Sequence, residues 1–370
     1  MSRSMVRRKV IAVASALTVG ALALSGCGAT NSGNGESGGS DVGSDNVNTK
    51  WADCTPGHGS KDTTSMKADG KKDITIGAFN GWDESFATAG IMKNVLEKDG
   101  YKVTIKGFDA GPGYAGLVAG DIDLLTDGWL PVTHADYVKR YGDKMENLGC
   151  WYDNAKLTIA VNKDSKARTI GDLKTMGDEY DNTLYGIEAG AGLTKATKDS
   201  AIPKYGLKNL NFKISSTPAM LAQLKKSTSA GQDIAVTLWR PHWAYGAFPV
   251  RDLKDPKKAM GNAEVIYSFG RPGFEQDFPK VAQLVRNMAF DDNKLSDLED
   301  TMFSADKYGG KNQEKAVEEW ISRNNDSVDK FKTGQLAEQK VSHRFWTTVP
   351  QPVADHGIQS PGCRCPLRIG

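Results

Sequence analysis

The chain has 370 residues, with 47 Lys and Arg against 45 Asp and Glu and a formal net charge of +2. Four of the basic residues stand among the first nine, and without them the balance is 43 against 45, or −2. A chain so close to neutral has no basic field for a polyanion, which excludes a nucleic-acid-binding protein.

The first 26 residues have the pattern of an export signal. A basic start is followed by an apolar run over residues 10–24, which is too short for a comfortable membrane span. The run ends in Leu-Ser-Gly-Cys, a small-residue cleavage site that resembles the bacterial lipobox. In a lipobox the cysteine receives lipid and becomes the mature N-terminus, so we expect an exported protein held on the extracytoplasmic face of the cell membrane through Cys27. A plain secretory peptide that happens to contain a cysteine is the alternative.

Residues 27–70 predict a lipid-anchored flexible tether. From Gly28 to about Lys50 the chain is almost entirely Gly, Ser, Asn, Asp and Thr, a composition that buries too little apolar surface to offset the entropy of ordering. About 40 flexible residues have an r.m.s. reach of roughly 35 Å. The folded body would therefore be mobile above a membrane surface.

Five cysteines are present, at positions 27, 54, 150, 363 and 365. Once Cys27 carries lipid, an oxidising exterior makes Cys54 and Cys150 a possible structural disulfide that ties the tether to the body. A zinc site at Cys54 is the alternative, with His58 as the one residue at ligand spacing. The Cys-Arg-Cys pair near the C-terminus has no further ligands nearby and is interpreted as part of a tail. No metal or cofactor is expected.

Short apolar runs alternate with amphipathic stretches from residue 73 to about residue 332, the βαβ pattern of an α/β protein. The helix predicted at 86–99 has its apolar residues near one face and stops at Gly100, a common C-terminal residue. Strands are predicted at 74–79, 102–108, 121–129, 156–162, 182–187, 212–216 and 233–239. Helices are predicted at 86–99, 114–119, 218–226, 279–288, 294–304 and 312–324.

Two lobes are expected, because about 260 residues is large for a single core. The strand series that begins near residue 182 predicts a second lobe, residues 163–249, inserted into a first lobe of residues 71–162 and 250–333. The return to the first lobe is expected around VRDLKD (250–255) or AEVIYSF (263–269). Residues 334–370 are rich in Pro and Gly, show no periodicity and predict a poorly ordered tail.

Three tryptophans stand at the ends of predicted strands: Trp82 in FNGWDES, Trp129 in TDGWLP and Trp239 in TLWRPHW. Ligands of open α/β sheets bind at the carboxyl ends of strands. A trimethylammonium group is charged but has no N–H donor, so aromatic faces recognise it better than hydrogen-bonding groups do, and Trp is the best of them. We interpret the three as an aromatic box for a quaternary ammonium, although ordinary packing would explain any one of them alone.

A second set of residues predicts contacts with an anion. The sequence EAGAGLTKATKDS follows a predicted strand and opens a helix, so the backbone N–H groups of Gly192 and Leu193 would point at a small carboxylate. His242 stands three residues after Trp239 and can donate a hydrogen bond to the same group. As a dinucleotide fingerprint the glycines are weak, because Lys195 occupies the third glycine position.

Several segments together resemble the substrate-binding proteins of glycine betaine (compatible-solute) ABC importers. They are NGWDES, GIEAGAGL, TLWRPHW and the long run GDIDLLTDGWLPVTHADYVKRYGDKMENLGCWYDNAKLTIAVN. The resemblance implies a two-lobed periplasmic-binding-protein-like fold of type II with the ligand in the interlobe cleft. It implies that Trp82, Trp129 and Trp239 hold the trimethylammonium and that Gly192, Leu193 and His242 hold the carboxylate.

The same resemblance implies a role in osmoprotection, with an ABC permease and its cytoplasmic ATPase as partners, and no enzymatic activity. Choline, carnitine and proline betaine are the alternative ligands. Choline has no carboxylate, so the residues expected to contact an anion would have no partner in it. An exported carbohydrate-active enzyme could instead use Asp83, Glu84 or Asp127 as acid and base. A non-catalytic surface adhesin is a further alternative, because it would also use a lipid anchor and a tether.

Overall fold

The computed structural model of the protein describes residue 51 and residues 54–336. The predicted signal at residues 1–26, the lipid site Cys27 and the tail from residue 337 onward lie outside the described residues. Among the described residues, no helix combines the length and the apolar character that a membrane span requires.

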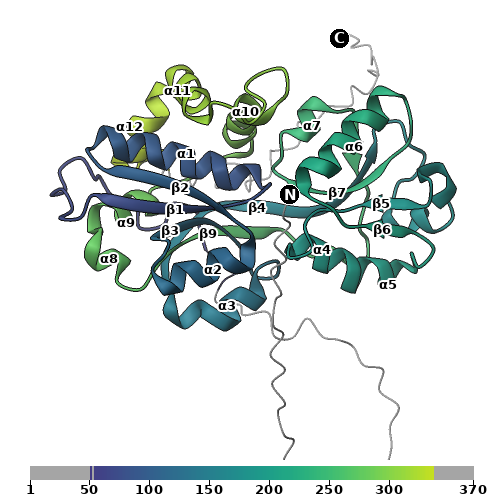
Figure 1. Cartoon of the computed structure of the whole chain (residues 1–370), viewed down its shortest axis with the longest axis horizontal. Coiled ribbons are helices and arrows are strands. Elements are labelled where there is room, and N and C mark those ends of the chain that lie inside the picture. Colours follow the sequence, from purple (N-terminus) through teal and green to yellow (C-terminus); the bar gives the residue numbers. More distant parts are fainter. Residues whose placement is uncertain (1–50, 52–53, 337–370) are drawn as a thin grey trace, which may run out of the picture. The chain divides into compact units, whose positions relative to one another are not determined.

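The first lobe is built on five strands in the order β2-β1-β3-β9-β4. β1 is parallel to β2 and β3, whereas β9 is antiparallel to β3 and β4. Every residue of β3 and β9 is buried, as expected for central strands covered on both faces, and Figure 1 shows helices on both sides. The strands are β1 (Asp73–Phe79), β2 (Lys102–Phe108), β3 (Leu124–Leu130), β4 (Glu146–Asn162) and β9 (Glu264–Gly270).

The five helices predicted for the first lobe are present, four of them with shifted starts. The first helix begins at Asp83, because Asp83 and Glu84 suit the positive end of the helix dipole. The second begins at Ala110, since Pro112 is tolerated in a first turn. The helices are α1 (Asp83–Lys98), α2 (Ala110–Ala119), α3 (Ala135–Tyr141), α8 (Phe274–Asp277), α9 (Pro279–Arg286), α10 (Asp292–Phe303), α11 (Gln313–Arg323) and α12 (Asn325–Thr333). Of these, α3, α8 and α12 were not predicted.

The second lobe has its own sheet, which shares one strand with the first. The 17 residues of β4 pair with β9 in their first part and with β7 in their second part, where Leu157 lies opposite Trp239. The strands are β5 (Thr183–Tyr185), β6 (Asn211–Lys213), β7 (Ala235–Arg240) and β8 (Val250–Asp252). The helices are α4 (Gly192–Ala196), α5 (Ile202–Tyr205), α6 (Thr217–Ser229) and α7 (Ala244–Ala247).

The chain returns to the first lobe near the later of the two expected segments, and not at residue 250. β8 pairs with β4 in the second sheet, with Asp252 opposite Ala160. The strand therefore continues the second lobe beyond residue 249, and the return falls in the segment between Asp252 and β9.

Part of the segment expected to be a tether belongs to the folded body. Thr63 is buried and donates its backbone N–H to the carbonyl of Lys332 at 2.9 Å. Asp69 is also buried and accepts hydrogen bonds from the Tyr101 hydroxyl and the Lys280 amide, both at 2.8 Å. Asn287 accepts from the backbone of Lys61 at 2.9 Å. These contacts hold the backbone from Lys61 onward and a disulfide holds Cys54, so the expected tether must end before residue 54.

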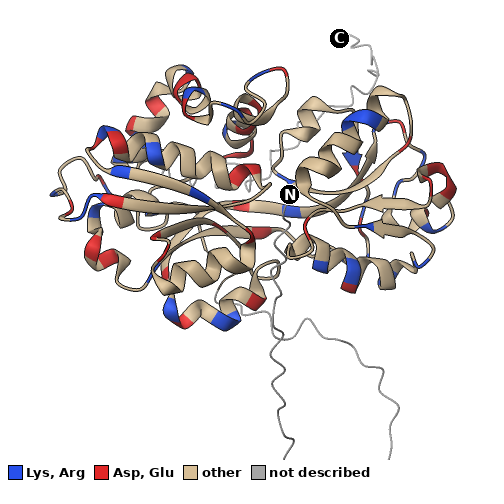
Figure 2. Ribbon diagram, in the orientation of Figure 1, with Lys and Arg blue, Asp and Glu red and all other residues tan. Residues whose placement is uncertain are grey.

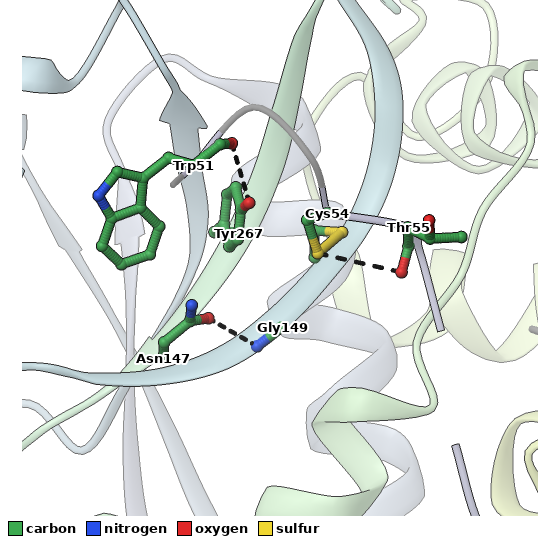
Figure 3. The surroundings of a disulfide bond; sticks show 7 residues. Trp51, Cys54, Thr55, Asn147, Gly149 and Tyr267 are labelled. Atoms are coloured by element: carbon green, nitrogen blue, oxygen red, sulfur yellow. Dashed lines mark hydrogen bonds between the residues drawn. A yellow bond between two sulfur atoms is a disulfide. The ribbon is translucent and has the colours of Figure 1, made fainter. Parts of the chain in front are cut away.

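Cys54 and Cys150 form a disulfide that joins this N-terminal segment to β4, with 6.1 Å between their Cα atoms (Figure 3). Trp51, just ahead of it, packs edge-on against Tyr267, whose hydroxyl donates to the carbonyl of Trp51 at 2.9 Å. With its sulfur in a disulfide, Cys54 has no thiolate for the alternative zinc site with His58. Within the part of the chain that the structure describes, no three His, Cys, Asp or Glu side chains are arranged so that they could hold a metal ion.

Candidate ligand-binding site

A small cavity lies where the two sheets meet. Residues from both lobes form its wall, and it is largely apolar. The lining residues are Trp82, Glu84, Trp129, Thr133, His134, Leu157, Ile187, Ala191, Gly192, Leu193 and Trp239. Five of the six predicted ligand-binding residues are therefore brought together.

The indole rings of Trp129 and Trp239 are each held by a buried carboxylate. In β3, the Trp129 Nε1–H donates to Asp127 Oδ1 at 2.8 Å. In β7, the Trp239 Nε1–H donates to Glu84 Oε2 at 3.0 Å, a contact between the two lobes. Because these bonds satisfy the polar edge of each ring, the rings can present apolar faces to the cavity without leaving a buried donor unpaired.

Trp82 is fixed differently, by stacking. It lies in the turn between β1 and α1, directly after Gly81, whose φ of 79° favours glycine. Its ring is parallel to that of His134, with 5.3 Å between centroids and 7° between planes. The third indole is thus supported by another residue of the cavity wall.

Gly192 and Leu193 open a continuous right-handed helical stretch that runs from Gly192 through α4 and a short π segment to the end of α5 at Tyr205. The first amides of such a stretch have no intrahelical acceptor, and the helix dipole favours an anion there. Gly192 also faces the other lobe closely, since a Cβ added to it would lie 2.3 Å from the carbonyl oxygen of Thr133. Only glycine permits this approach.

His242 does not line the cavity, and its predicted place in the site needs correction. β7 ends at Arg240, and the chain then turns so that His242 lies beside Trp239, edge to face, with 4.5 Å between ring centroids. Its Nδ1 accepts from the Ala244 amide at 3.0 Å, and its Nε2 lies 3.9 Å from Asp83 Oδ2. Burial lowers its pKa to about 3, so the ring is neutral. It packs against Trp239 without lining the cavity.

His134 is the wall residue that sequence reasoning missed. Its Nδ1 accepts the backbone N–H of Trp129 at 2.9 Å, and burial lowers its pKa to about 3, so the single ring proton resides on Nε2. That Nε2–H is buried and has no hydrogen-bond partner in the described part of the chain. The signal was present in WLPVTH, where a histidine follows a predicted cage tryptophan by five residues.

Glu264 holds the loop that carries His134. Its carboxylate accepts hydrogen bonds from the backbone N–H groups of Val132 at 2.7 Å and Thr133 at 2.9 Å, and another from the Thr133 hydroxyl. Glu264 belongs to β9, more than 130 residues away in sequence. This long-range support fixes the position of the histidine relative to Trp129.

Four carboxylates lie behind the aromatic rings: Asp83, Glu84, Asp127 and Glu299. Burial is the main cause of their raised pKa values, which reach about 7 for Asp83 and Asp127 and lie well above the usual range for Glu84 and Glu299. Asp83 accepts from the Trp243 indole, and Asp83 and Asp127 are not wall residues. This use of the acids as indole acceptors gives no support to the alternative of a carbohydrate-active enzyme.

A family profile matches residues 72–323, that of OpuAC, the substrate-binding domain of ABC-type glycine betaine transport systems. The chain belongs to this family. The family comprises transport substrate-binding proteins rather than enzymes, and its match confirms the resemblance seen in the sequence motifs.

Curated relatives and solved structures agree with this assignment. The glycine betaine/carnitine transport binding protein GbuC of Listeria monocytogenes is 36% identical over 163 residues, which are 44% of this chain and 52% of GbuC. The match thus spans about half the length of that relative. ProX of Borrelia burgdorferi, a glycine betaine/L-proline-binding protein, has a TM-score of 0.65 and 29% identity over 72% of this chain and 100% of ProX.

Lactococcal OpuAC in its closed, glycine betaine-bound conformation has a TM-score of 0.64 and 26% identity over 70% of this chain and 99% of that one. The predicted two-lobed periplasmic-binding-protein-like fold is therefore confirmed. The OpuAC structure contains glycine betaine.

Proposed function

We propose that this protein is the extracytoplasmic receptor of an ABC importer and captures glycine betaine, or a related quaternary ammonium carboxylate, between its lobes. The observation that carries the proposal is the convergence of Trp82, Trp129 and Trp239 on one small cavity whose wall also holds hydrogen-bond donors. Each ring attracts a desolvated cation by about 0.5 to 2 kcal/mol. Three rings together supply several kcal/mol to a ligand head that has no N–H to donate.

The carboxylate of the ligand would be held by donors from opposite lobes. His134 offers its unpaired Nε2–H from the first lobe, and the amides of Gly192 and Leu193 offer the start of a helical stretch from the second. We assign the side-chain donor to His134 in place of His242, since His134 lies on the cavity wall and His242 does not.

Closure of the lobes would be coupled to capture. Trp82 and Trp129 come from the first lobe, whereas Trp239 and the amides come from the second, so a ligand bridges both. The lobes also contact each other directly: the Tyr137 hydroxyl donates to the Gly190 carbonyl at 3.3 Å. A ligand that contacts both lobes binds the closed form more tightly than the open form and shifts the population toward it.

The donor half of the wall favours a carboxylated ligand over choline. Choline has no carboxylate, so it would leave the buried Nε2–H of His134 unpaired, a cost of about 1–3 kcal/mol. Proline betaine and carnitine carry both charges and remain the close competitors.

The test is isothermal titration calorimetry of the unlipidated protein with glycine betaine, proline betaine, carnitine and choline. Carboxylated ligands should bind with 1:1 stoichiometry and more tightly than choline. Trp129→Ala should abolish or strongly weaken binding, while Trp320→Phe, in the core of the first lobe, should leave it unchanged. Absence of saturable binding by every ligand would refute the proposed function.

Delivery to a permease with a cytoplasmic ATPase, and anchoring through a lipid on Cys27, complete the proposal. Delivery to the permease is supported by membership of the OpuAC family, and the lipid anchor is supported by the export signal and lipobox in the sequence. Cys27→Ala should release the protein from the membrane fraction and reduce uptake of glycine betaine by cells under osmotic stress. Retention of the variant in the membrane fraction would contradict the anchor.

A further inference from the structure

The carboxylates behind the rings form a cluster of unusual composition. Glu84, Asp127 and Glu299 are at most 2% exposed, and the side chain of Asp83 is 14% exposed. They come from α1, β3 and α10, so the fold brings them together from distant parts of the first lobe. Figure 2 shows the acidic start of α1 at the end of the helix that lies toward the second lobe.

Lys and Arg do not neutralise this cluster. Within the described residues, the one ion-pair contact of the four is Asp83 with His242 at 3.9 Å, and burial keeps His242 neutral by lowering its pKa. The other groups facing the cluster are neutral as well. His134 has a lowered pKa and Tyr114, on α2, has a pKa raised well above its usual value.

Neutral groups, chiefly indole and backbone N–H, donate hydrogen bonds to the four acids. Trp129 donates to Asp127, Trp239 donates to Glu84, and Trp243 donates its indole N–H to Asp83 and its backbone N–H to Glu299 at 3.1 Å. Glu299 Oε1 is buried and has no hydrogen-bond partner among the described residues. Neutral donors of this kind compensate a buried negative charge only in part. The cluster therefore lacks a positive charge that would neutralise an ionised member.

Glu84 is the member of the cluster that reaches the ligand cavity. It lies on the wall, whereas Asp83, Asp127 and Glu299 do not. Its carboxylate also receives the Trp239 indole N–H from the other lobe. One side chain therefore faces the space proposed for the trimethylammonium and positions the cage ring that arrives on closure.

We infer that Glu84 provides the counter-charge of the bound cation, and that capture of the ligand expels one proton from the four-carboxylate cluster into solvent. This inference rests on the proposed function. It adds that the site must supply a negative charge to the cation and that binding releases a proton. A hydrogen bond from an indole N–H to an ionised carboxylate is stronger than one to a neutral acid. Ionisation of Glu84 would thus both attract the cation and hold Trp239 more firmly in the cage.

The direction of the pH effect follows from the environment of Glu84. Burial, followed by the charges of Asp127 and Glu299, raises the pKa of Glu84 well above 4.5, so the ligand-free cluster holds protons near neutral pH. A cation at the cavity wall stabilises the ionised form and lowers that pKa. At a pH between the pKa of Glu84 in the ligand-bound protein and its pKa in the ligand-free protein, binding releases a proton. Affinity therefore rises with pH by up to about tenfold per pH unit for one proton.

The experiment is calorimetric titration of the unlipidated protein with glycine betaine at about pH 6 and about pH 8, in two buffers of different ionisation enthalpy. The difference in apparent binding enthalpy between buffers counts the protons released. Wild-type protein should release a proton at the lower pH and bind more tightly at the higher pH. Glu84→Gln keeps the size and an oxygen acceptor for Trp239, and it should bind more weakly with a flatter pH profile. Glu318→Gln, an exposed residue of α11, is the matched control and should behave as wild type.

A neutral ligand adds a second readout. In 3,3-dimethylbutanoate a carbon atom replaces the quaternary nitrogen of glycine betaine, so the molecule keeps the shape and the carboxylate but loses the cation. Its binding to wild type should be much weaker than that of glycine betaine and should release no proton, and Glu84→Gln should narrow the gap between the two ligands.

The outcomes separate this inference from the proposed function. Tight binding of glycine betaine with no proton release and a Kd independent of pH would overturn the inference and leave the function standing. An unchanged preference for the cation in Glu84→Gln would also overturn it. Failure of glycine betaine to bind wild type at either pH would instead reject the proposed function. If Glu84→Gln does not fold, the number of protons that wild-type protein releases on binding still tests the inference.

Discussion

Replacement of Gly192 by alanine tests whether closure of the lobes is needed for binding. The added Cβ would lie 2.3 Å from the Thr133 carbonyl oxygen and 2.5 Å from its Cγ2. Gly192 belongs to the second lobe and Thr133 to the first, and the nearest atom is backbone, which cannot rotate away. The variant keeps the backbone N–H proposed to contact the ligand. Its effect should therefore come from the clash alone.

The size of the effect follows from the geometry. An ordinary van der Waals contact begins at 3.4 Å, against 2.3 Å here, so the lobes would have to stop roughly 1 Å short of the closed position. Overpacking of this kind costs about 1–3 kcal/mol, which corresponds to a Kd raised by roughly 5-fold to 150-fold. The clash exists only in the closed form, so the thermal stability of the ligand-free protein should change little.

Titration calorimetry and thermal unfolding of the two variants Gly192→Ala and Gly190→Ala give the comparison. Gly190 lies in the same turn and lacks a positive φ, and a Cβ added to it would meet no heavy atom within 4 Å, so its substitution should leave Kd unchanged. Equal affinity of Gly192→Ala and wild type would refute the argument that this contact forms on closure. Equal losses in both variants would show that helix-start conformation, not the clash, is responsible.

Three further predictions concern the donor, the disulfide and the buried acids. His134→Gln should lower the affinity for glycine betaine by roughly 10-fold to 150-fold, as expected for loss of a hydrogen bond to a charged group, and should lower the affinity for choline less. Equal losses for the two ligands would refute the donor role. His242→Gln is the control and should not distinguish the two ligands. Reduction of Cys54–Cys150, which spans 96 residues, should lower the free energy of unfolding by about 2–5 kcal/mol with Kd nearly unchanged. Ligand-free stability should fall as pH rises from about 5 to about 7, since Asp127, with its pKa raised to about 7, keeps a proton in the native state over this range that the unfolded state has lost; a chemical denaturation series showing a rise would contradict this.

The predicted cage could be read from the sequence because strand ends converge in an α/β fold. Trp82, Trp129 and Trp239 follow or end three strands, and each arrives at the same cavity. The choice of histidine could not be read in the same way. His242 is near Trp239 in sequence and packs against its ring, but it does not line the cavity. His134 lies on the wall because distant Glu264 holds its loop.

The end of the tether was mispredicted for a related reason. Residues 54–70 are polar and glycine-containing, so they have the composition of a flexible segment. Their order depends on partners more than 200 residues away, among them Asn287 and Lys332. The observed helix ends also differ from the predicted ones by a few residues. The spacing of apolar residues does not define where a helix ends, and local capping and proline effects decide it.

A crystal structure of the protein with glycine betaine tests the central claim most directly. The account predicts closed lobes, the trimethylammonium among Trp82, Trp129 and Trp239 within about 6 Å of each ring, and the carboxylate on His134 Nε2 and the amides of Gly192 and Leu193. A ligand bound outside this cavity, or a carboxylate that contacts none of these donors, would contradict it.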